Sequence, residues 1–491
     1  MPLSDAKTGM ASALNRFFNS VAYPICLAAL CAFSGLGGYP RYTALMSVIA
    51  LCVIATALFS SDNKALIPPM FMSFYALGQD EAIRLNPGGG DVIAAYAPEA
   101  FAFVIFLGVV AVAVLMARFW MDGTLKAVVH NPGFFTASIV AMALAFLLNG
   151  AFSSHWKPIN LLYGLLMALG FAFFYLLCSS IVRRSQNPTK YICQSLVFTC
   201  LLVLVQVVVR LWQLHAAGVL NLQEGILQDY QRSRLQLGWG IATTISGVLS
   251  LGIPVALYLA SNYRFSGLYY GFALLLFAGV VFLGTRSATF IGGITLLVGM
   301  VLCCFGRNRR ICRMLAGGLF ACLGAGLVVC HFLWMPFPQL LEKAIAACRL
   351  QKLFSPQWLD GFLADDRFAM WVTGWEDFKH WPIFGVGFDK GAFPPELKLQ
   401  NVYSNMYHCI FVQFFAATGG LGTLSYLLHS VQFSRLLIRK FTCNRMLVLL
   451  LPMMIVAMSL VDNFFFYLNF QIFYCVFLAV GEIDKEHFNE K

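Results

Sequence analysis

The sequence predicts an all-α membrane protein of many spans, and three observations lead to this prediction. Of the 491 residues, 60% are hydrophobic and only 11% are charged, and the mean hydropathy is +0.76. A soluble domain carries roughly 25% charged residues, so a soluble globular protein is excluded. Apolar runs of about 20 residues recur almost to the end of the chain. This excludes a soluble enzyme that is held to the membrane by a single N-terminal signal anchor. Because the runs are continuous rather than alternating, they are typical of helices and not of an outer-membrane barrel.

About fourteen apolar runs are long enough to be candidate spans. The third and the last two are short, so about 12–14 transmembrane helices are predicted. The run 405–437 is interrupted by Gly419, Gly420 and Gly422, which predicts either one bent helix or a partial helix followed by a span. In chain order, the candidates are residues 19–37, 42–60, 65–79, 98–117, 132–151, 159–182, 191–213, 237–260, 266–284, 287–306, 314–335, 405–437, 446–462 and 464–481.

Lysine and arginine in the short loops orient these spans. If the N-terminus is cytoplasmic, three basic clusters fall on the inner side and both termini are cytoplasmic. Residues 336–404 then form one long extracytoplasmic loop, with helix-like stretches at 339–352 and 366–379. Loops of this length are usually functional. The clusters are Arg183 and Arg184, then Arg307, Arg309, Arg310 and Arg313, then Arg435, Arg439, Lys440 and Arg445.

The net charge of +11 has two interpretations in such a protein. It reflects either cytoplasmic loops that face anionic lipid or a basic site for an anionic substrate on the outer side, and nucleic acid is not an expected partner. The 15 cysteines lie mostly in apolar runs and lack the spacing of metal ligands. No phosphate-loop, HExxH or GxSxG motif occurs, so neither a metal nor another cofactor is expected.

Cationic residues at the outer boundary are the candidate site, because charges there are costly to desolvate and tend to be functional or paired. Arg286 lies in a short outer hairpin between two spans, Arg367 opens a helix of the long loop, and His408 lies at the outer start of the twelfth span. Arg234 precedes the eighth span, and Arg210 lies at the outer end of the seventh. Several guanidiniums on one face suit a pyrophosphate, and a neutral imidazole beside them could accept a proton from an attacking hydroxyl.

Several of these signals also have a purely structural interpretation. Arg210 can be a snorkelling side chain, and a lone histidine such as His408 can cap a helix. The pair Asp365 and Asp366 fits the start of a helix better than a metal site. The sequence Gly385-Val-Gly387 lacks the strand and helix of a nucleotide fingerprint, so a tight turn after the loop helix is predicted.

Three motifs follow one another in the region from about 275 to 425, about a third of the chain. The first is Phe282-Leu-Gly-Thr-Arg286-Ser-Ala-Thr-Phe. The second is Arg367-Phe-Ala-Met-Trp371 followed by Trp381-Pro-Ile-Phe-Gly-Val-Gly387, and the third is His408, followed eleven residues later by Gly419 and then by Gly422. Together they resemble the O-antigen ligase / O-antigen polymerase superfamily of bacterial membrane glycosyltransferases. Thr285 and Cys409 stand where that superfamily usually has Ser and Asn, and Asn405 precedes the histidine instead.

The resemblance implies a multi-span, GT-C-like glycosyltransferase that inverts its substrate and needs neither metal nor nucleotide. Its donor would be a glycan on undecaprenyl pyrophosphate, at the outer face of the bacterial inner membrane. The arginines would hold the pyrophosphate, and His408 would act as general base or orient the acceptor hydroxyl. The implied site comprises the catalytic candidates His408, Arg286 and Arg367, the pyrophosphate-binding candidates Arg234, Arg286 and Arg367, and the further candidates Arg210, Tyr407 and Asn405.

Three functions stay open at this point. A ligase would transfer a finished polysaccharide to a lipid A core or a similar envelope acceptor, and a polymerase would extend a glycan from the same donor. A transporter or flippase of lipid-linked sugars would need ionisable residues along the membrane midplane, whereas the charges here lie at the outer boundary. The expected partners are the lipid-linked glycan donor, the glycan or lipid A core acceptor and membrane lipid. The predicted parts are an N-terminal bundle (1–265), a ligase-like catalytic region (266–440) and C-terminal helices with a cytoplasmic tail (441–491).

Overall fold

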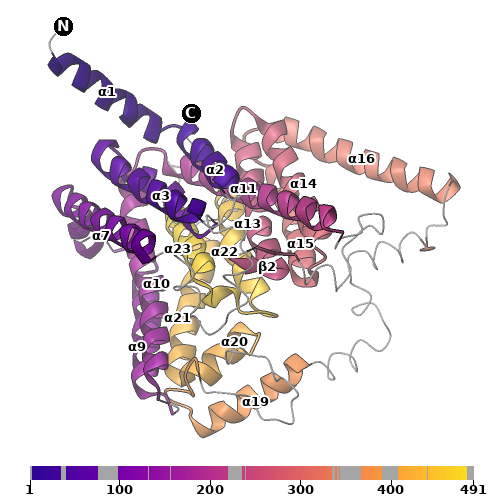
Figure 1. The fold of residues 1–491 in the computed structure, drawn as a ribbon. Coiled ribbons are helices and arrows are strands. Elements are labelled where there is room, and N and C mark those ends of the chain that lie inside the picture. The colour runs from indigo at the N-terminus through magenta and orange to yellow at the C-terminus, as the bar shows by residue number, and fades with distance from the viewer. Residues whose placement is uncertain are drawn as a thin grey trace. The chain divides into compact units, whose positions relative to one another are not determined.

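A computed structural model gives the structure of the chain, and Figure 1 shows that it is built almost entirely of helices. The residues that it describes are 3–34, 40–75, 98–130, 132–154, 156–218, 235–237, 239–333, 338–339, 342, 366–389, 407–439 and 441–483. The chain divides into two compact units that are interleaved along the sequence. Unit 1 comprises residues 1–131, 180–285 and 483–491, and unit 2 comprises residues 132–179 and 286–482. The three-part division of the sequence analysis stays a prediction.

Among the described residues, seven helices are long and apolar enough to cross a membrane, and six shorter helices are also apolar. This set confirms the prediction of an all-α membrane protein with many spans. The long helices are Phe103–Met121, Pro158–Arg184, Pro188–Ala216, Ala242–Asn262, Arg286–Cys303, Arg309–Val329 and Ile410–Arg439. The shorter ones are Ala22–Ala32, Leu45–Phe59, Thr136–Phe152, Ser266–Phe282, Cys443–Met458 and Leu468–Glu482.

Unit 1 contains the N-terminal helices and a pair of long helices packed on each other, α13 and α14. The candidate span 65–79 is not one continuous helix in its described part but three short pieces, and Pro68 and Pro69 lie in the first turn of the second piece, where proline is tolerated. A two-stranded antiparallel pair precedes α13, where the sequence predicts the start of a span. The elements are α1 (Leu3–Phe18), α2 (Ala22–Ser34), α3 (Pro40–Phe59), η1 (Asn63–Leu66), α4 (Ile67–Met72), η2 (Ser73–Tyr75), α7 (Pro98–Met121), α8 (Thr124–His130), α11 (Pro188–Ala216), β1 (Gln236–Leu237), β2 (Gly240–Ile241), α13 (Ala242–Asn262) and α14 (Ser266–Phe282).

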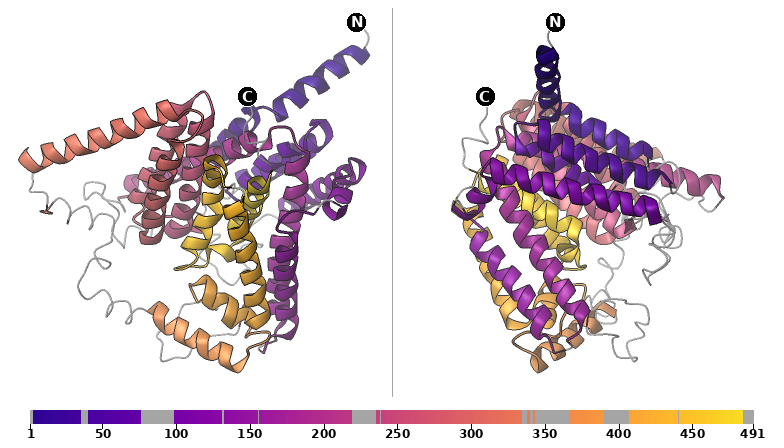
Figure 2. Two further views of the ribbon diagram at one scale, coloured as in Figure 1. Left: turned by 180° about the vertical axis from the view of Figure 1, so that it is seen from behind. Right: turned by 60° about the vertical axis from the view of Figure 1, so that its left-hand side comes forward.

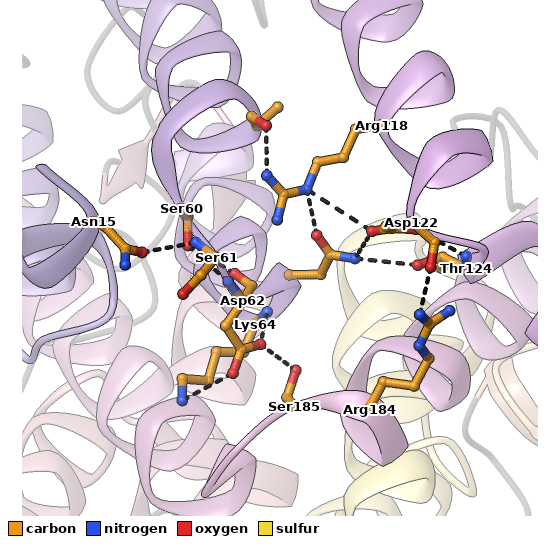
Figure 3. Close-up of polar contacts among 12 residues, drawn as sticks. Asn15, Ser60, Ser61, Asp62, Lys64, Arg118, Asp122, Thr124, Arg184 and Ser185 are labelled. Carbon is orange, nitrogen blue, oxygen red and sulfur yellow. Dashed lines mark hydrogen bonds and ion pairs between the residues drawn. The ribbon is translucent and has the colours of Figure 1, made fainter. Parts of the chain in front are cut away.

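A polar cluster joins three loops at one end of unit 1 (Figure 3). Asp62, after α3, accepts hydrogen bonds from the hydroxyl of Ser185 and from the backbone N–H of Gln186 at 2.9 Å. Asn63 donates to Asp122, after α7, at 2.6 Å and accepts from Arg118. Burial raises the pKa of Asp122, but hydrogen bonds from Thr124 and Asn63 and the charge of Arg184 outweigh it and hold that pKa below its usual range. The loops that the sequence assigns to one side of the membrane therefore meet.

Unit 2 holds the second and third motifs of the sequence analysis and the part of the first that begins at Arg286. Its long helices α9 and α21 pack on each other, as do α15 and α22 and then α22 and α23. Helices α9 and α10 run side by side (Figure 2), and Gly150 and Gly164 allow their backbones to touch. The elements are α9 (Thr136–Phe152), most of α10 (Pro158–Arg184), α15 (Arg286–Cys303), α16 (Arg309–Leu333), α19 (Asp366–His380), α20 (Ile410–Val412), the π-helical turn η6 (Gln413–Ala417), α21 (Thr418–Arg439), α22 (Cys443–Met458), η7 (Phe464–Phe466) and α23 (Leu468–Glu482).

The run 405–437 is a partial helix followed by a span, one of the two predicted alternatives. The pieces α20 and η6 lead into α21, and the backbone at Gly419 is not helical (φ +67°, ψ −163°). The long-loop helix predicted at 366–379 is α19, Asp366–His380. The other predicted loop helix, 339–352, lies almost wholly outside the described residues.

Candidate active site

The loop after α19 fills the break in helix α21. A break in a helix leaves carbonyls before it and amides after it without intrahelical partners, and in a membrane each must find another. The loop supplies both kinds of partner, so four hydrogen bonds hold it in the break. They run from Val386 N to Ala416 O (3.0 Å), from Gly387 N to Ala417 O (3.0 Å), from Gly420 N to Pro382 O (2.6 Å) and from Leu421 N to Ile383 O (3.4 Å).

The glycines of the second and third motifs are required by this docking. Gly385 (φ +69°) and Gly419 (φ +67°) adopt left-handed backbone conformations that favour glycine. A Cβ atom on Gly385 would lie 2.5 Å from the carbonyl oxygen of Ala417, and one on Gly419 would overlap the carbonyl of Ile383. The structure thus confirms the tight turn predicted at Gly385–Gly387.

Two buried asparagines clamp this loop to α9 and α10. The amide nitrogen of Asn149 donates both to Phe384 O (2.6 Å) and to Ala417 O, so it joins the loop to the broken helix. The side chain of Asn160 accepts from Asp389 N at 2.6 Å and donates to Asp389 O at 3.0 Å. The loop between α19 and residue 389 is therefore a fixed element of unit 2.

His408 stands immediately before the broken helix in an unusual backbone conformation. Its φ is +50°, in the left-handed region that costs a non-glycine residue of order 1–3 kcal/mol. The flanking backbone holds it there: Tyr407 N donates to Gln413 Oε1 at 3.0 Å, and Ile410 N donates to Ser459 O at 2.7 Å. Strained residues held from both sides cluster at functional sites.

The imidazole of His408 is paired with a carboxylate. Its Nδ1 lies 3.2 Å from Oδ1 of Asp462, in the turn between α22 and α23. Burial raises the pKa of Asp462, but the hydrogen bond and charge of His408, the N–H of Asn463 and the charge of Arg367 together lower it below its usual range. An ionised carboxylate at Nδ1 favours the tautomer with the proton on Nδ1, which leaves Nε2 as a proton acceptor.

Arg367 lies close enough to this pair for its charge to act on Asp462. It is an exposed residue in the first turn of α19. Two hydrogen bonds fix α19 to the chain next to His408, from Trp371 Nε1 to Tyr407 O at 2.9 Å and from Tyr407 Oη to Asp377 at 2.6 Å. Burial and the charge of Asp377 raise the pKa of Tyr407, so this buried phenol holds α19 as a neutral donor.

Arg286 lies at the same end of unit 2 as Asp462. The thiol of Cys303, at the end of α15, interacts with that of Cys443, at the start of α22. The two packed helices are therefore antiparallel, and they have similar lengths of 18 and 16 residues. It follows that the first residue of α15, the exposed Arg286, lies beside the end of α22 that leads to Asp462.

Three candidates of the sequence analysis are not part of this cluster of described residues. Arg210 is a half-buried residue of α11 in unit 1. Arg234 and Asn405 lie outside the described residues. Within the described part of the chain, no three His, Cys, Asp or Glu side chains come together in a way that could hold a metal ion.

Sequence reasoning missed Asp462, Gln413 and Asn463. Asn463 is buried and donates to Gln413 Oε1 at 3.3 Å, so it supports the bond that holds Tyr407. One signal for Asp462 was available: it is the only charged residue in the long apolar stretch 446–481. A lone carboxylate at the edge of a span is costly unless it is paired.

Comparison with known proteins places the three motifs in one family region. The model of the family described as O-Antigen ligase matches residues 271–427, which include Arg286, Arg367 and His408. No curated protein matches the chain significantly. The family match and the apolar helices indicate a multi-pass membrane protein that transfers glycosyl groups in the manner of a ligase or polymerase. The resemblance found in the sequence is thus confirmed: residues 271–427 of this chain match the model of the O-antigen ligase family.

Proposed function

We propose that this protein transfers a glycan from undecaprenyl pyrophosphate to an envelope acceptor at the outer face of the bacterial inner membrane. The pairing of His408 with Asp462, within reach of the charge of Arg367, is the observation that carries the proposal. The acceptor would be a lipid A core or a similar glycan. The family match favours glycosyl transfer over the transport of lipid-linked sugars.

The proposed reaction is a single inverting displacement. Nε2 of His408 accepts the proton of the acceptor hydroxyl, or orients that hydroxyl, while its oxygen attacks the anomeric carbon. The bond from that carbon to the pyrophosphate oxygen breaks, and undecaprenyl pyrophosphate leaves on the opposite side. Arg286 and Arg367, with Arg234 as a further ligand, stabilise the charge that develops on the diphosphate. Since the lipid already activates the sugar, the proposal requires no metal and no nucleotide.

Arginine-to-lysine substitutions test the diphosphate ligands. Arg286→Lys and Arg367→Lys keep the charge but lose the planar fork that binds two phosphate oxygens. Each is expected to lower kcat/KM by about 10–100-fold, as the loss of one or two charge-assisted hydrogen bonds would. The assay is transfer by the purified protein in nanodiscs, from a synthetic polyprenyl-diphosphate oligosaccharide. Arg310→Lys, at the exposed start of α16, is the matched control and should stay fully active. Full activity of both test variants would contradict the assigned roles.

His408 and Asp462 are tested in the same assay. His408→Gln is expected to lower kcat by about 10²–10⁴, the usual contribution of general acid–base catalysis. Asp462→Asn should lower kcat less than His408→Gln does, since it removes the charge that selects the tautomer of His408. An unchanged kcat in His408→Gln would remove the proposed base.

The acceptor decides between ligase and polymerase. A purified lipid A core and a second lipid-linked repeat unit are offered separately to the same preparation. Transfer to the core identifies a ligase, and growth of the lipid-linked chain identifies a polymerase. The two reactions share the donor site, so the arginine variants should weaken either one.

A further inference from the structure

Helix α19 and the end of α9 present large apolar side chains to the surface. Although α19 lies in the segment between the eleventh and twelfth candidate spans, aromatic side chains are half exposed on it and just after it. We define the apolar rim as five residues with their exposed fractions: Phe152 (61%), Trp156 (57%), Trp375 (50%), Trp381 (49%) and Ile383 (60%). Exposed large apolar side chains that gather on neighbouring elements mark a partner surface.

The rim is held in place by packing. The ring of Trp375 lies 5.9 Å from that of Phe415 and 5.7 Å from that of Phe378. Phe152 packs on Phe384 with ring centroids 5.5 Å apart. These side chains are presented rigidly, so little conformational freedom remains to be lost when a partner covers them.

The rim adjoins an exposed apolar face of α21, which belongs to a candidate membrane span. Four exposed apolar residues follow one face of that span at the spacing of a helix: Leu421, Leu424, Leu428 and Val431. The backbone N–H of Leu421, where this stripe begins, donates to Ile383 O. The rim therefore adjoins the first residue of the stripe, and α19 lies across the end of α9 and α21 (Figure 1).

The composition of the rim matches the boundary between lipid and water. Tryptophan is enriched there because its ring is apolar and its N–H is polar. After Trp381 come Pro382 and Ile383, which offer no side-chain hydrogen bonds to a sugar, and before it the exposed His380 uses Nδ1 for Glu376 O at 2.8 Å. The nearby charges of Glu376 and Lys379 pair with each other at 2.7 Å. These features favour a lipid surface over a glycan as the partner.

We propose that the apolar rim seats α19 in the headgroup region of the bilayer. The partner is the lipid surface itself, and Trp375 and Trp381 are the anchoring side chains. If the proposed function holds, this seat fixes the height of Arg367 and His408 at the level where the diphosphate of a lipid carrier lies. The anchoring itself does not depend on the reaction.

Fluorine NMR of the full chain in lipid nanodiscs tests the anchoring. The nine tryptophans are replaced by 5-fluorotryptophan, and Trp375→Phe and Trp381→Phe each remove one resonance and so assign it. Lipids with a spin label at carbon 5 of the acyl chain should broaden both resonances. Trp371 is the internal control, because it is half-buried and its indole N–H donates to Tyr407 O. Its resonance should stay sharp.

The outcomes separate the two proposals. If the lipid-borne label fails to broaden the resonance of either Trp375 or Trp381, the proposed anchoring is overturned, whatever the result of the transfer assay. Resonances that instead shift with a soluble oligosaccharide would identify a glycan surface and would equally overturn it. Broadening at both positions in a protein without transferase activity would leave the anchoring intact and reject the proposed function.

Discussion

At the scale of single residues, the backbone does as much for the candidate site as the side chains. His408 takes a left-handed conformation, and Gly385 and Gly419 take conformations that favour glycine. The side chain of His408 reaches Asp462 from this position. The strain at His408 and the pairing of its ring are parts of one arrangement, because the bonds of Tyr407 and Ile410 fix both.

Asp462 makes the stability of the protein depend on pH in the acidic range. Its pKa in the folded chain lies below that in the unfolded chain, so its ionised form stabilises the fold above the unfolded pKa, about 3.9. That stabilisation is lost as the pH falls through the lowered folded-state pKa. The midpoint of thermal unfolding in detergent should be higher for the wild type than for Asp462→Asn at pH 7. The difference between the two unfolding midpoints should become smaller below about pH 4. A difference that stays constant over this pH range would contradict the pairing of Asp462 with His408.

Gly385→Ala adds one Cβ atom and so tests the docking of the loop after α19 into the break of α21. The new Cβ would lie 2.5 Å from Ala417 O on a backbone with φ of +69°. We expect a loss of about 1–3 kcal/mol in the free energy of unfolding, with reduced transfer activity. Gly271→Ala in α14 is the matched control: it has open space and a helical backbone, where alanine stabilises by up to about 1 kcal/mol. Equal unfolding midpoints for the two variants would show that the docking is unimportant.

At the scale of elements, helix α21 is stable because another segment completes it. The docked loop supplies the hydrogen bonds that the break at Gly419 removes, and Asn149 and Asn160 fix the loop from α9 and α10. Asn160→Ala should therefore speed hydrogen exchange at the amides of Val386, Gly387 and Asp389 by about tenfold, as the loss of about 1.4 kcal/mol would. Amides in the middle of α9 serve as the reference, and a uniform increase in both places would mean general destabilisation instead.

A buried carboxylate holds the start of α9. Glu482, at the end of α23, accepts hydrogen bonds from Phe134 N (2.9 Å), Tyr175 Oη (2.7 Å) and Ser179 Oγ (2.7 Å). A negative charge at the N-terminus of a helix also complements the helix dipole. Glu482→Ala leaves these buried donors without their acceptor, so the free energy of unfolding should fall by about 1–3 kcal/mol.

The control for this variant is Glu376→Ala on α19. Glu376 is exposed, and its ion pair with Lys379 is half exposed as well, so its loss should cost at most about 1 kcal/mol. Thermal unfolding in detergent measures both variants. A smaller effect for Glu482→Ala than for Glu376→Ala would show that the carboxylate does not cap α9.

At the scale of the whole molecule, the chain passes back and forth between its two units. Within each unit, loops that are far apart in the sequence meet at one end of that unit. In unit 1 the loops after α3, α7 and α10 meet in one polar cluster. In unit 2 the beginning of α15 and the end of α22 share the end that holds Asp462. The alternating crossings of the membrane stay a prediction.

The predicted orientation has a direct test in the intact membrane. A C-terminal fusion of green fluorescent protein should fluoresce, because the predicted tail is cytoplasmic. Alkaline phosphatase fused after Lys352, in the long loop, should be active, because that loop is predicted outside. A C-terminal fusion that does not fluoresce, together with an inactive phosphatase in the loop, would reverse the orientation and place the proposed site on the wrong side for its donor.

Local composition by itself determined the fold class, the approximate spans, the loop helix at α19 and the turn at Gly385–Gly387. Each of these follows from apolar run length, from charge or from glycine within one short segment. Only the tertiary structure decided which residues gather around His408. Asp462 lies 54 residues away in the chain, and its pairing depends on how α22 and α23 pack. The docking of the loop into broken α21 likewise depends on hydrogen bonds between distant segments, which no local pattern specifies.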